Sequence, residues 1–313
     1  MTVVLVTGGA GFIGSHVCDS LLAQTHTVVA IDDLSSGHLA NIGDARTYGD
    51  RFTFYSLDIR VEGLPAIFER HRPDVVMHLA AMRETPGAMD PSREARVGLM
   101  GLLAVLECSA AAEVGKVVFA SSACMYGEPR SVPIKETALP GARPLRPGAI
   151  CKRVAEDYLR FYQGTRGLDF TSLVLPSVFG PRQDPDAGTG VVASFAGRMV
   201  AGEKPEIWGD GEQTRDFLFI DDAVHALRLA VEAGSGRTMN IGTGRETTVN
   251  ELFQMLAEMI GFEGEPLYGP LRPDDVRRNA LDSSLAAKQL AWKPWTHLED
   301  GLRETVAYLR SLA

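Results

Sequence analysis

The feature that most constrains this sequence is the glycine-rich run TGGAGFIG at Thr7–Gly14, which follows an apolar segment and leads into an amphipathic stretch. A strand that passes into a helix within so few residues needs glycine at the turn. We assign the tight turn to Gly8, the approach of the backbone to a pyrophosphate to Gly11, and close helix–sheet packing to Gly14. The helix that starts at Phe12 offers unpaired N–H groups to the phosphates. A turn of purely structural use is the alternative.

An acidic pair strengthens this interpretation. Asp32 and Asp33 follow the predicted strand Thr27–Ile31, near the distance of about 20 residues at which a carboxylate hydrogen-bonds the adenosine ribose. A carboxylate there repels a 2′-phosphate, so the pattern favours NAD over NADP. The alternative is that the two aspartates only begin a turn before Ser35.

The first half of the chain alternates apolar runs with amphipathic stretches. The apolar runs predict strands at Thr2–Thr7, Thr27–Ile31, Phe52–Leu57, Asp74–Leu79 and Lys116–Ala120. Because these runs lack strict polar alternation, we expect helices on both faces of the sheet. The predicted fold class is therefore α/β, with a doubly wound parallel sheet of the Rossmann type.

The second half of the chain is mixed. Segments rich in Gly, Pro and Asp separate three further predicted elements: a strand at Thr171–Leu175, a helix at Asp221–Ala233 and a strand at Met239–Ile241. We expect a first, NAD-binding domain at residues 1–166, to which residues 216–243 return. A smaller mixed α/β lobe is expected at residues 167–313.

Composition and charge argue against several classes of partner. The chain has 313 residues, 45% of them hydrophobic, and a formal net charge of -9, which repels polyanions. We expect no nucleic-acid partner, because no run rich in Lys and Arg could follow a phosphate backbone. No apolar run reaches the roughly 18 residues of a membrane span, so we expect a cytoplasmic protein without membrane association. The cysteines and histidines lack the spacing of metal sites, and we expect no metal.

Further motifs extend over nearly the whole chain. They are Asp58-Ile59, HLAA at His78–Ala81, SSACMYG at Ser121–Gly127, Lys152, GPRQ at Gly180–Gln183, GDG at Gly209–Gly211, RDF at Arg215–Phe217 and RPDD at Arg272–Asp275. With the first glycine turn, these motifs identify a family. The sequence resembles the nucleotide-sugar epimerase/dehydratase branch of the extended short-chain dehydrogenases/reductases, and within it the UDP-glucose 4-epimerase-like proteins.

The resemblance implies that the protein binds NAD and a nucleotide sugar, with a UDP-sugar favoured. It also implies a homodimer formed through helices at Glu94–Ala112 and Ala149–Phe161. Together with the glycine turn and the acidic pair, the expected cofactor contacts are Gly8, Gly11, Phe12, Ile13, Gly14, Asp32, Asp33, Asp58, Ile59, Leu79, Ala80, Ala81 and Lys152. The expected substrate contacts are Ser177, Arg182, Arg215, Arg272 and Asp275. Guanidinium groups suit a diphosphate because they donate parallel, charge-assisted hydrogen bonds.

The resemblance also implies a reaction by transient oxidation at C4 of the sugar. In this family a tyrosine takes the hydroxyl proton while hydride moves to NAD, assisted by a serine or threonine and by a lysine. Ser122 matches the serine and Lys152 matches the lysine. The tyrosine should stand four residues before the lysine, where this sequence has Gly148. Pro147 matches the residue that commonly precedes the tyrosine.

Other positions near the expected sugar site also depart from the family pattern. They are Met82, Arg83, Gly98 and Ser177. The cofactor motifs are intact, so the pattern indicates that NAD binding is retained while the chemistry facing the sugar is altered. The candidates to replace the tyrosine are a water held by Ser122 and Lys152 beside Gly148, the phenol of Tyr126, and the thiolate of Cys124 or Cys151.

These observations favour one function and leave two others open. Ala123 and Cys124 stand where a 4,6-dehydratase has an Asp-Glu pair, so ordinary dehydration is disfavoured. The retained Ser122 and Lys152 favour an NAD-dependent 4-epimerase-like isomerase with a non-standard proton relay. The open alternatives are a catalytically silent protein that binds NAD and a nucleotide sugar, and a different NAD-dependent redox reaction on such a sugar.

Overall fold

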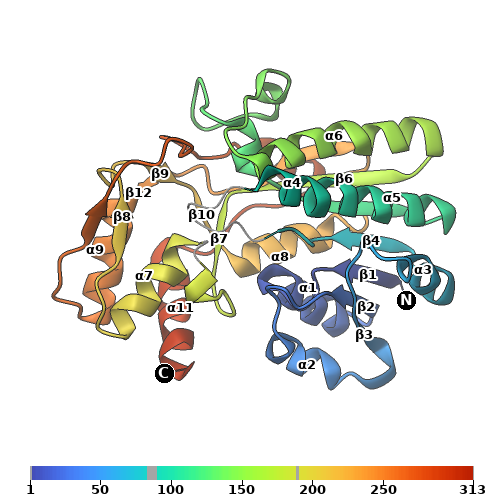
Figure 1. Cartoon of the computed structure of the whole chain (residues 1–313), viewed down its shortest axis with the longest axis horizontal. Coiled ribbons are helices and arrows are strands. Elements are labelled where there is room, and N and C mark those ends of the chain that lie inside the picture. Colours follow the sequence, from blue (N-terminus) through green and yellow to red (C-terminus); the bar gives the residue numbers. More distant parts are fainter. Residues whose placement is uncertain (1, 83–89, 188–189, 313) are drawn as a thin grey trace.

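A parallel sheet of seven strands forms the centre of the protein (Figure 1). The structure, a computed structural model, describes residues 2–82, 90–187 and 190–312. The strands lie in the order β11-β6-β5-β4-β1-β2-β3, and every neighbouring pair is parallel. They are β1 (Val3–Thr7), β2 (Thr27–Asp32), β3 (Phe52–Ser56), β4 (Val75–His78), β5 (Lys116–Ser122), β6 (Asp169–Leu175) and β11 (Arg237–Asn240). The predicted doubly wound sheet is confirmed.

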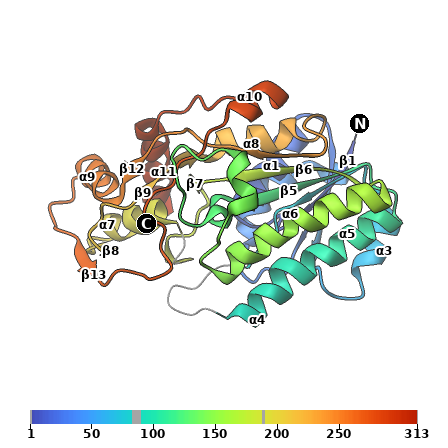
Figure 2. The same ribbon diagram turned by 90° about the horizontal axis from the view of Figure 1, so that it is seen from above.

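Helices cover both faces of this sheet (Figure 2). One face carries α1 (Phe12–Ala23) and α8 (Ile220–Leu229), and the other carries α3 (Leu64–His71), α5 (Gly101–Ala111) and α6 (Pro147–Arg166). On β1, Val4 and Val6 pack in the core that includes α1, whereas Leu5 packs in the core that includes α3, α5 and α6. Alternate residues of one strand thus reach opposite layers, which explains why its sequence is apolar throughout.

A π-helical segment interrupts the helix that we predicted at Glu94–Ala112. The chain forms α4 (Pro91–Glu94), the π-helical η3 (Ala95–Met100) and then α5. η3 lies against α6, and a Cβ on Gly98 would be 3.4 Å from the Cβ of Cys151. π-Helical turns insert an extra residue and are frequent near functional sites. The predicted helix at Glu94–Ala112 is therefore present, but its part at Ala95–Met100 is π-helical.

The remaining elements form a smaller lobe at one end of the sheet (Figure 1). It contains the helices α7 (Val191–Val200), α9 (Val249–Ile260) and α11 (Leu298–Leu312) and the strand pairs β7 (Ser177–Phe179) with β10 (Phe217–Phe219), β8 (Glu206–Trp208) with β13 (Leu267–Gly269), and β9 (Thr214–Arg215) with β12 (Thr247–Thr248). Two short helices, α2 (Gly43–Arg46) and α10 (Ser284–Leu290), lie outside these groups. Among the described residues, no helix is both long and apolar enough to cross a membrane.

The central sheet continues beyond residue 166, where we expected the first domain to end. β6 pairs with β5 over seven residues, from Asp169 to Leu175. β11, which pairs with β6, lies within the segment 216–243 that we expected to return. The division into an NAD-binding domain and a nucleotide-sugar lobe stays a prediction.

The buried side chain of Asp216 joins three segments of the smaller lobe. Its carboxylate accepts hydrogen bonds from Thr243 through the backbone N–H at 2.9 Å and the hydroxyl at 2.6 Å. It also accepts from the N–H groups of Gly244 and Leu281, each at 3.0 Å. Four donors use most of the accepting capacity of a carboxylate, so the loops around it depend on its charge and shape.

We expect Asp216→Asn to lower the free energy of unfolding by about 2 kcal/mol, because its amide group would face N–H donors that now have an acceptor. Urea denaturation measures this change. Asp210→Asn is the matched control: Asp210 is exposed, and we expect a change within about 0.5 kcal/mol. Equal stability of Asp216→Asn and the wild type would show that the carboxylate does not hold these loops.

Candidate active site

The turn between β1 and α1 is built around contacts that only glycine permits. Gly8 has a positive φ of 72°, and a Cβ there would lie 2.8 Å from the amide nitrogen of Ala80. A Cβ on Gly14 would lie 2.0 Å from the carbonyl oxygen of Gly8. Gly11 caps α1 without a side chain, so the first N–H groups of the helix are left for a ligand. This bare backbone at a helix N-terminus fits the pyrophosphate of a dinucleotide.

Asp32 supports the turn from the neighbouring strand β2. Its carboxylate accepts hydrogen bonds from the N–H groups of Ala10 at 3.0 Å and Leu34 at 2.9 Å, and burial raises the pKa of Asp32. Each carboxylate oxygen has a second lone pair, so ribose hydroxyls could still be accepted. Asp33 instead accepts hydrogen bonds from Ser35, through its N–H at 2.9 Å and its hydroxyl at 2.6 Å.

Residues after β4 approach the same turn from the other side. The N–H of Leu79 donates to the carbonyl of Thr7 at 3.1 Å, and the N–H of Ala80 donates to the Thr7 hydroxyl at 3.3 Å. Ala81, the next residue, is exposed. The HLAA motif therefore lies directly beside the glycine turn.

Asp58 and Ile59 follow β3, the strand next to β2. Ile59 is buried, and a Cβ on Gly101 would be 2.8 Å from its Cδ1. Asp58 forms an ion pair with Arg60, and hydrogen bonding from Arg60 lowers the pKa of Asp58. Since β4, β1, β2 and β3 are adjacent in the sheet, the expected NAD contacts other than Lys152 gather along one edge formed by the strands' carboxyl ends.

Ser122 and Lys152 both lie at the carboxyl end of β5. Ser122 is the last residue of this strand. Lys152 lies in the second turn of α6, and its side chain reaches the strand at Ala120. The Nζ of Lys152 donates to the carbonyl of Ala120 at 2.6 Å and lies 4.4 Å from the centroid of the Phe119 ring. The Ser122 hydroxyl oxygen accepts a hydrogen bond from the N–H of Cys124 at 3.3 Å, so its own O–H can donate elsewhere. Burial lowers the pKa of Lys152 to about 8.

Gly148 lies in the first turn of α6, directly after Pro147. Residues four apart in a helix share a face, so this glycine is on the same side of α6 as Lys152. The position four residues before the lysine on this face therefore has no side chain. That a tyrosine has been replaced at this position stays a prediction.

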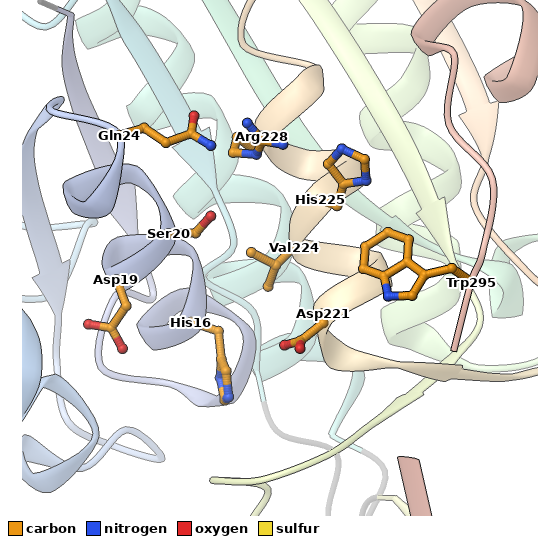
Figure 3. A pocket seen from close by; sticks show the side chains of 9 residues that line it. All are labelled: His16, Asp19, Ser20, Gln24, Asp221, Val224, His225, Arg228 and Trp295. Carbon is orange, nitrogen blue, oxygen red and sulfur yellow. The ribbon is translucent and has the colours of Figure 1, made fainter. Parts of the chain in front are cut away.

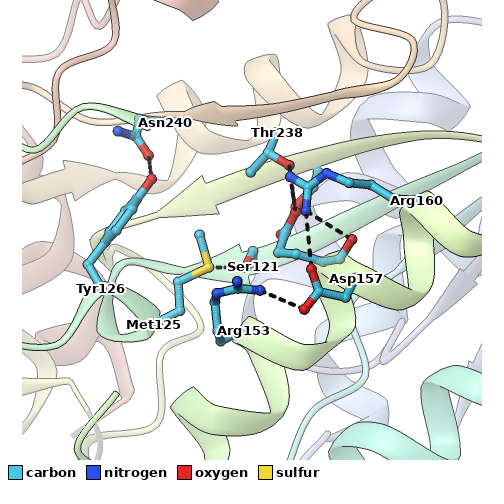
Figure 4. A network of polar contacts seen from close by, with 10 residues as sticks. Ser121, Met125, Tyr126, Arg153, Asp157, Arg160, Thr238 and Asn240 are labelled. Atoms are coloured by element: carbon cyan, nitrogen blue, oxygen red, sulfur yellow. Dashed lines mark hydrogen bonds and ion pairs between the residues drawn. The ribbon is translucent and has the colours of Figure 1, made fainter. Parts of the chain in front are cut away.

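Tyr126 does not fit the role of a replacement base. Its side chain is buried, and its hydroxyl donates to the Oδ1 of Asn240 at 2.7 Å (Figure 4). Burial raises the pKa of Tyr126 further above its ordinary value, which opposes ionisation. Turning the ring inward would also leave Asn240 without this partner in the core. The structure thus argues against this candidate and gives the residue a packing role.

The two candidate thiols differ in their surroundings. Cys151 is buried, and burial raises the pKa of its thiol, which disfavours the thiolate that a base would need. Cys124 is exposed and lies two residues after Ser122. Of the other departures from the family pattern, Gly98 lies in η3, whereas Arg83 lies outside the described residues.

The expected diphosphate residues gather where β9 meets the segment after β13. Arg215 forms an ion pair with Asp275, and its Nη1 donates to the carbonyl of Val276 at 2.8 Å. The guanidinium of Arg272 lies 4.4 Å from the ring centroid of Trp208. The structure therefore brings Arg215 and Asp275 together, and it holds Arg272 against an aromatic ring.

Arg146 was missed by the sequence reasoning, although it directly precedes α6. Its Nε lies 2.8 Å from a carboxylate oxygen of Asp274, and its Nη2 lies 3.9 Å from Asp275. It therefore ties the start of the helix that carries Lys152 to the RPDD motif. No spacing rule points to this pair, because the two partners are 128 residues apart.

Arg182 lies elsewhere, which argues against the substrate contact that we expected for it. Its guanidinium pairs with Asp19 of α1 at 2.7 Å and with Asp44 of α2 at 3.3 Å. The guanidinium that was expected to bind a phosphate is thus already paired with two carboxylates of the first domain. Ser177, in contrast, is tied by its N–H to the carbonyl of Asp216 at 3.0 Å, next to Arg215.

Glu156 was also missed, although it lies one helical turn after Lys152. The side chain is fully buried, and its two oxygens accept hydrogen bonds from the hydroxyls of Ser172 and Thr238, each at 2.5 Å. Arg160 reaches the same carboxylate only at 3.9 Å (Figure 4). A charged residue on the buried face of α6 was the available signal.

A cavity of about 510 Å³ lies between α1 and α8 (Figure 3). Its lining includes His16 and Asp19 from α1, Asp221 and His225 from α8, and Trp295. None of the residues expected from the sequence to bind cofactor or substrate lines it. It therefore lies apart from the candidate active site.

Known proteins align with almost the whole chain in sequence and in structure. The sequence model of the NAD dependent epimerase/dehydratase family matches residues 4–242. A UDP-glucose 4-epimerase of Mycolicibacterium smegmatis is 40% identical over 310 residues, which cover 98% of each chain. The UDP-glucose 4-epimerase of Thermotoga maritima with UDP-glucose is 43% identical, with a TM-score of 0.94 and coverage of 99% of both chains. That of Thermus thermophilus in complex with NAD is 36% identical, with a TM-score of 0.90 and coverage of 99% of this chain and 100% of the other.

We expect Tyr126→Phe to lower the free energy of unfolding by about 1–2 kcal/mol, because Asn240 would lose a buried hydrogen-bond donor. Turnover should stay within about twofold of the wild type, since this hydroxyl is committed to packing. Urea denaturation and product analysis measure the two effects. A large loss of turnover without a loss of stability would return the phenol to the catalytic candidates.

Proposed function

This chain belongs to the NAD dependent epimerase/dehydratase family, and we propose that it is a nucleotide-sugar 4-epimerase whose proton relay lacks the usual tyrosine. The observation that carries the proposal is the placement of Ser122 and Lys152 at the end of β5, beside an intact glycine turn. A UDP-sugar is the favoured substrate, because the similar proteins at 40% and 43% identity are UDP-glucose 4-epimerases.

The residues around the glycine turn fit NAD. Gly8, Gly11 and Gly14 leave a backbone cradle that a Cβ would fill, and Asp32 stands beside it with free accepting capacity. When bound, NAD supplies a hydride acceptor for C4 of the sugar and later a hydride donor. The carboxylate of Asp32 would bind ribose hydroxyls and repel a 2′-phosphate.

The arginine cluster would hold the nucleotide end of the substrate. Arg272 presents a guanidinium on the Trp208 ring, and Arg215 fixes the same segment through Asp275. A planar guanidinium donates two parallel hydrogen bonds to a phosphate. We therefore assign the diphosphate to Arg272 first, with Arg215 and Asp275 setting the position of the loop that carries it.

Ser122 and Lys152 would act on the sugar itself. The Ser122 O–H is available to donate to the C4 oxygen, which orients the hydroxyl before its proton leaves. Lys152 is held on β5 through Ala120, one turn from Gly148. The same two residues would serve both directions of the reaction, because epimerisation removes and returns one proton.

We also propose a homodimer formed by α6 and the helical segment before it. Ile150 and Phe161 of α6 and Met100 of η3 are large apolar side chains that are about half exposed. α5 and α6 lie side by side on one outer face of the molecule (Figure 2). A second copy would cover this face. The four cysteines are unpaired, which suits the reducing cytoplasm that we propose as its location.

The absence of a tyrosine four residues before Lys152, where the sequence has Gly148, favours one competing function. A protein that keeps NAD and a nucleotide sugar without converting the sugar would need the glycine turn and the arginine cluster but no proton acceptor. Product analysis separates the two functions, because only an epimerase makes more product than there is protein.

Purified protein of known NAD content should convert at least one UDP-sugar of a panel to its C4 epimer in molar excess over protein. dTDP- and GDP-sugars complete the panel, and nuclear magnetic resonance of the products identifies the epimer. Ser122→Ala should slow turnover by about 10²-fold, because a donor to the reacting oxygen is lost. Ser311→Ala, at an exposed position of α11, is the control and should not slow turnover. Tight sugar binding without conversion across the panel would favour the silent binder.

Ile150→Glu should convert the dimer to a monomer, because a carboxylate would have to be buried between two apolar faces. Sedimentation equilibrium measures the mass. Leu312→Glu, at an exposed apolar site on α11, is the matched control and should leave the dimer intact. A dimer that persists in Ile150→Glu would place the contact elsewhere.

A further inference from the structure

The amine of Lys152 lies on the same face of α6 as Gly148, one helical turn later. Its Nζ is fixed by the hydrogen bond to Ala120 at 2.6 Å and lies 4.4 Å from the Phe119 ring centroid. Ser122 is the last residue of β5, two residues beyond Ala120. The amine and the Ser122 hydroxyl are therefore held at one end of one strand.

Among the residues that the structure describes, four titratable groups act on this amine from the elements around it: Cys151 and Glu156 from α6, Glu94 from α4, and His78 from β4. Burial lowers the pKa of His78 to about 3, and burial raises the pKa of the Cys151 thiol, so both are uncharged near neutral pH. The two glutamates favour the ammonium, but burial outweighs them and lowers the pKa of Lys152 to about 8. A substantial fraction of the amine is then neutral in mildly alkaline solution.

We propose that the amine of Lys152 is itself the proton acceptor and donor of the epimerisation, at the place where this family uses a phenol. This inference rests on the proposed function. The neutral amine takes the proton of the C4 hydroxyl while the C4–H bond breaks. The hydrogen would leave with both electrons of that bond as hydride, for which bound NAD would be the acceptor. The C4–O bond becomes a carbonyl. In the return step the ammonium gives its proton back to the oxygen, and the hydride that bound NAD would supply would add to the other face of C4, so atoms and charge balance over the cycle.

The hydrogen bonds of the site allow this role. A neutral primary amine has two N–H donors and one lone pair, so it can keep its bond to Ala120 and still accept a proton. The Ser122 oxygen already accepts the N–H of Cys124, which leaves its hydroxyl proton for the sugar oxygen. Gly148 adds no competing acid or base to this face of α6.

The first test compares two pH titrations of the NAD-loaded protein. Competitive acetylation with acetic anhydride, read by mass spectrometry, reports the protonation of Lys152 without turnover, with the exposed Lys135 as internal reference. The second titration follows kcat with a UDP-sugar. Both should have a midpoint near pH 8, with kcat rising about tenfold per pH unit below it, because only the neutral amine is active.

Glu156→Gln removes a buried charge that favours the ammonium. Both midpoints should therefore move to lower pH by the same amount. An acetylation midpoint that moves while the kcat profile stays in place would overturn the proposal, because the titrating group of the reaction would then be another one. Asp157→Asn is the matched control, because Asp157 follows Glu156 in α6 and its carboxylate is exposed. This variant should move neither midpoint.

The second test is Lys152→Arg. Arginine keeps a cation and N–H donors but cannot become a neutral base, so kcat measured with saturating NAD and UDP-sugar should fall by about 10²–10⁴-fold. Lys135→Arg is the control and should keep wild-type kcat. If Lys152→Arg retains kcat within about tenfold, a fixed cation suffices and the proposal fails. A wild type that binds NAD but converts no sugar would instead overturn the proposed function.

Discussion

The packing of α1 against the end of β1 is the constraint on which the rest of the site depends. Because Gly14 lacks a Cβ, the helix can start within contact of the Gly8 carbonyl, close to the centre of the sheet. β1 lies there between β2 and β4, where the strand order reverses. Asp32 and Ala80 reach the same turn from these two strands. A single turn therefore collects residues that are far apart in the sequence.

The chemistry of Lys152 follows from how it is enclosed. An ammonium taken from water loses solvation free energy, which the carbonyl of Ala120, the ring of Phe119 and the carboxylate of Glu156 offset only in part. The remainder appears as a lowered pKa. In a site with a tyrosine before the lysine, a nearby phenolate would favour the charged amine. A glycine at position 148 offers no such anion, so the identity of one residue changes what its neighbour can do.

The sequence predicted the secondary structure of the sheet well and its long-range polar contacts poorly. The six strands expected up to Leu175 end within two residues of the observed limits, because each is a compact apolar run. Tyr126 and Arg182 were assigned roles at the site, but their partners, Asn240 and Asp19, are 114 and 163 residues away. Local sequence patterns do not indicate contacts with residues so far away in the chain. The π-helical turn of η3 was missed for a related reason, since tertiary packing rather than composition separates it from an α-helix.

Glu156 links the stability of the fold to the electrostatics of the site. Its carboxylate joins α6 to Ser172 of β6 and Thr238 of β11, the two strands that extend the sheet beyond residue 166. A buried carboxylate is unfavourable unless hydroxyl donors and a nearby cation compensate for the lost water. Two hydroxyls supply the hydrogen bonds, and the ammonium of Lys152 supplies attraction through space. When the amine is neutral, the carboxylate loses that attraction and keeps only the two hydroxyls and the more distant Arg160 at 3.9 Å, so the same network that holds the sheet together opposes deprotonation of the lysine.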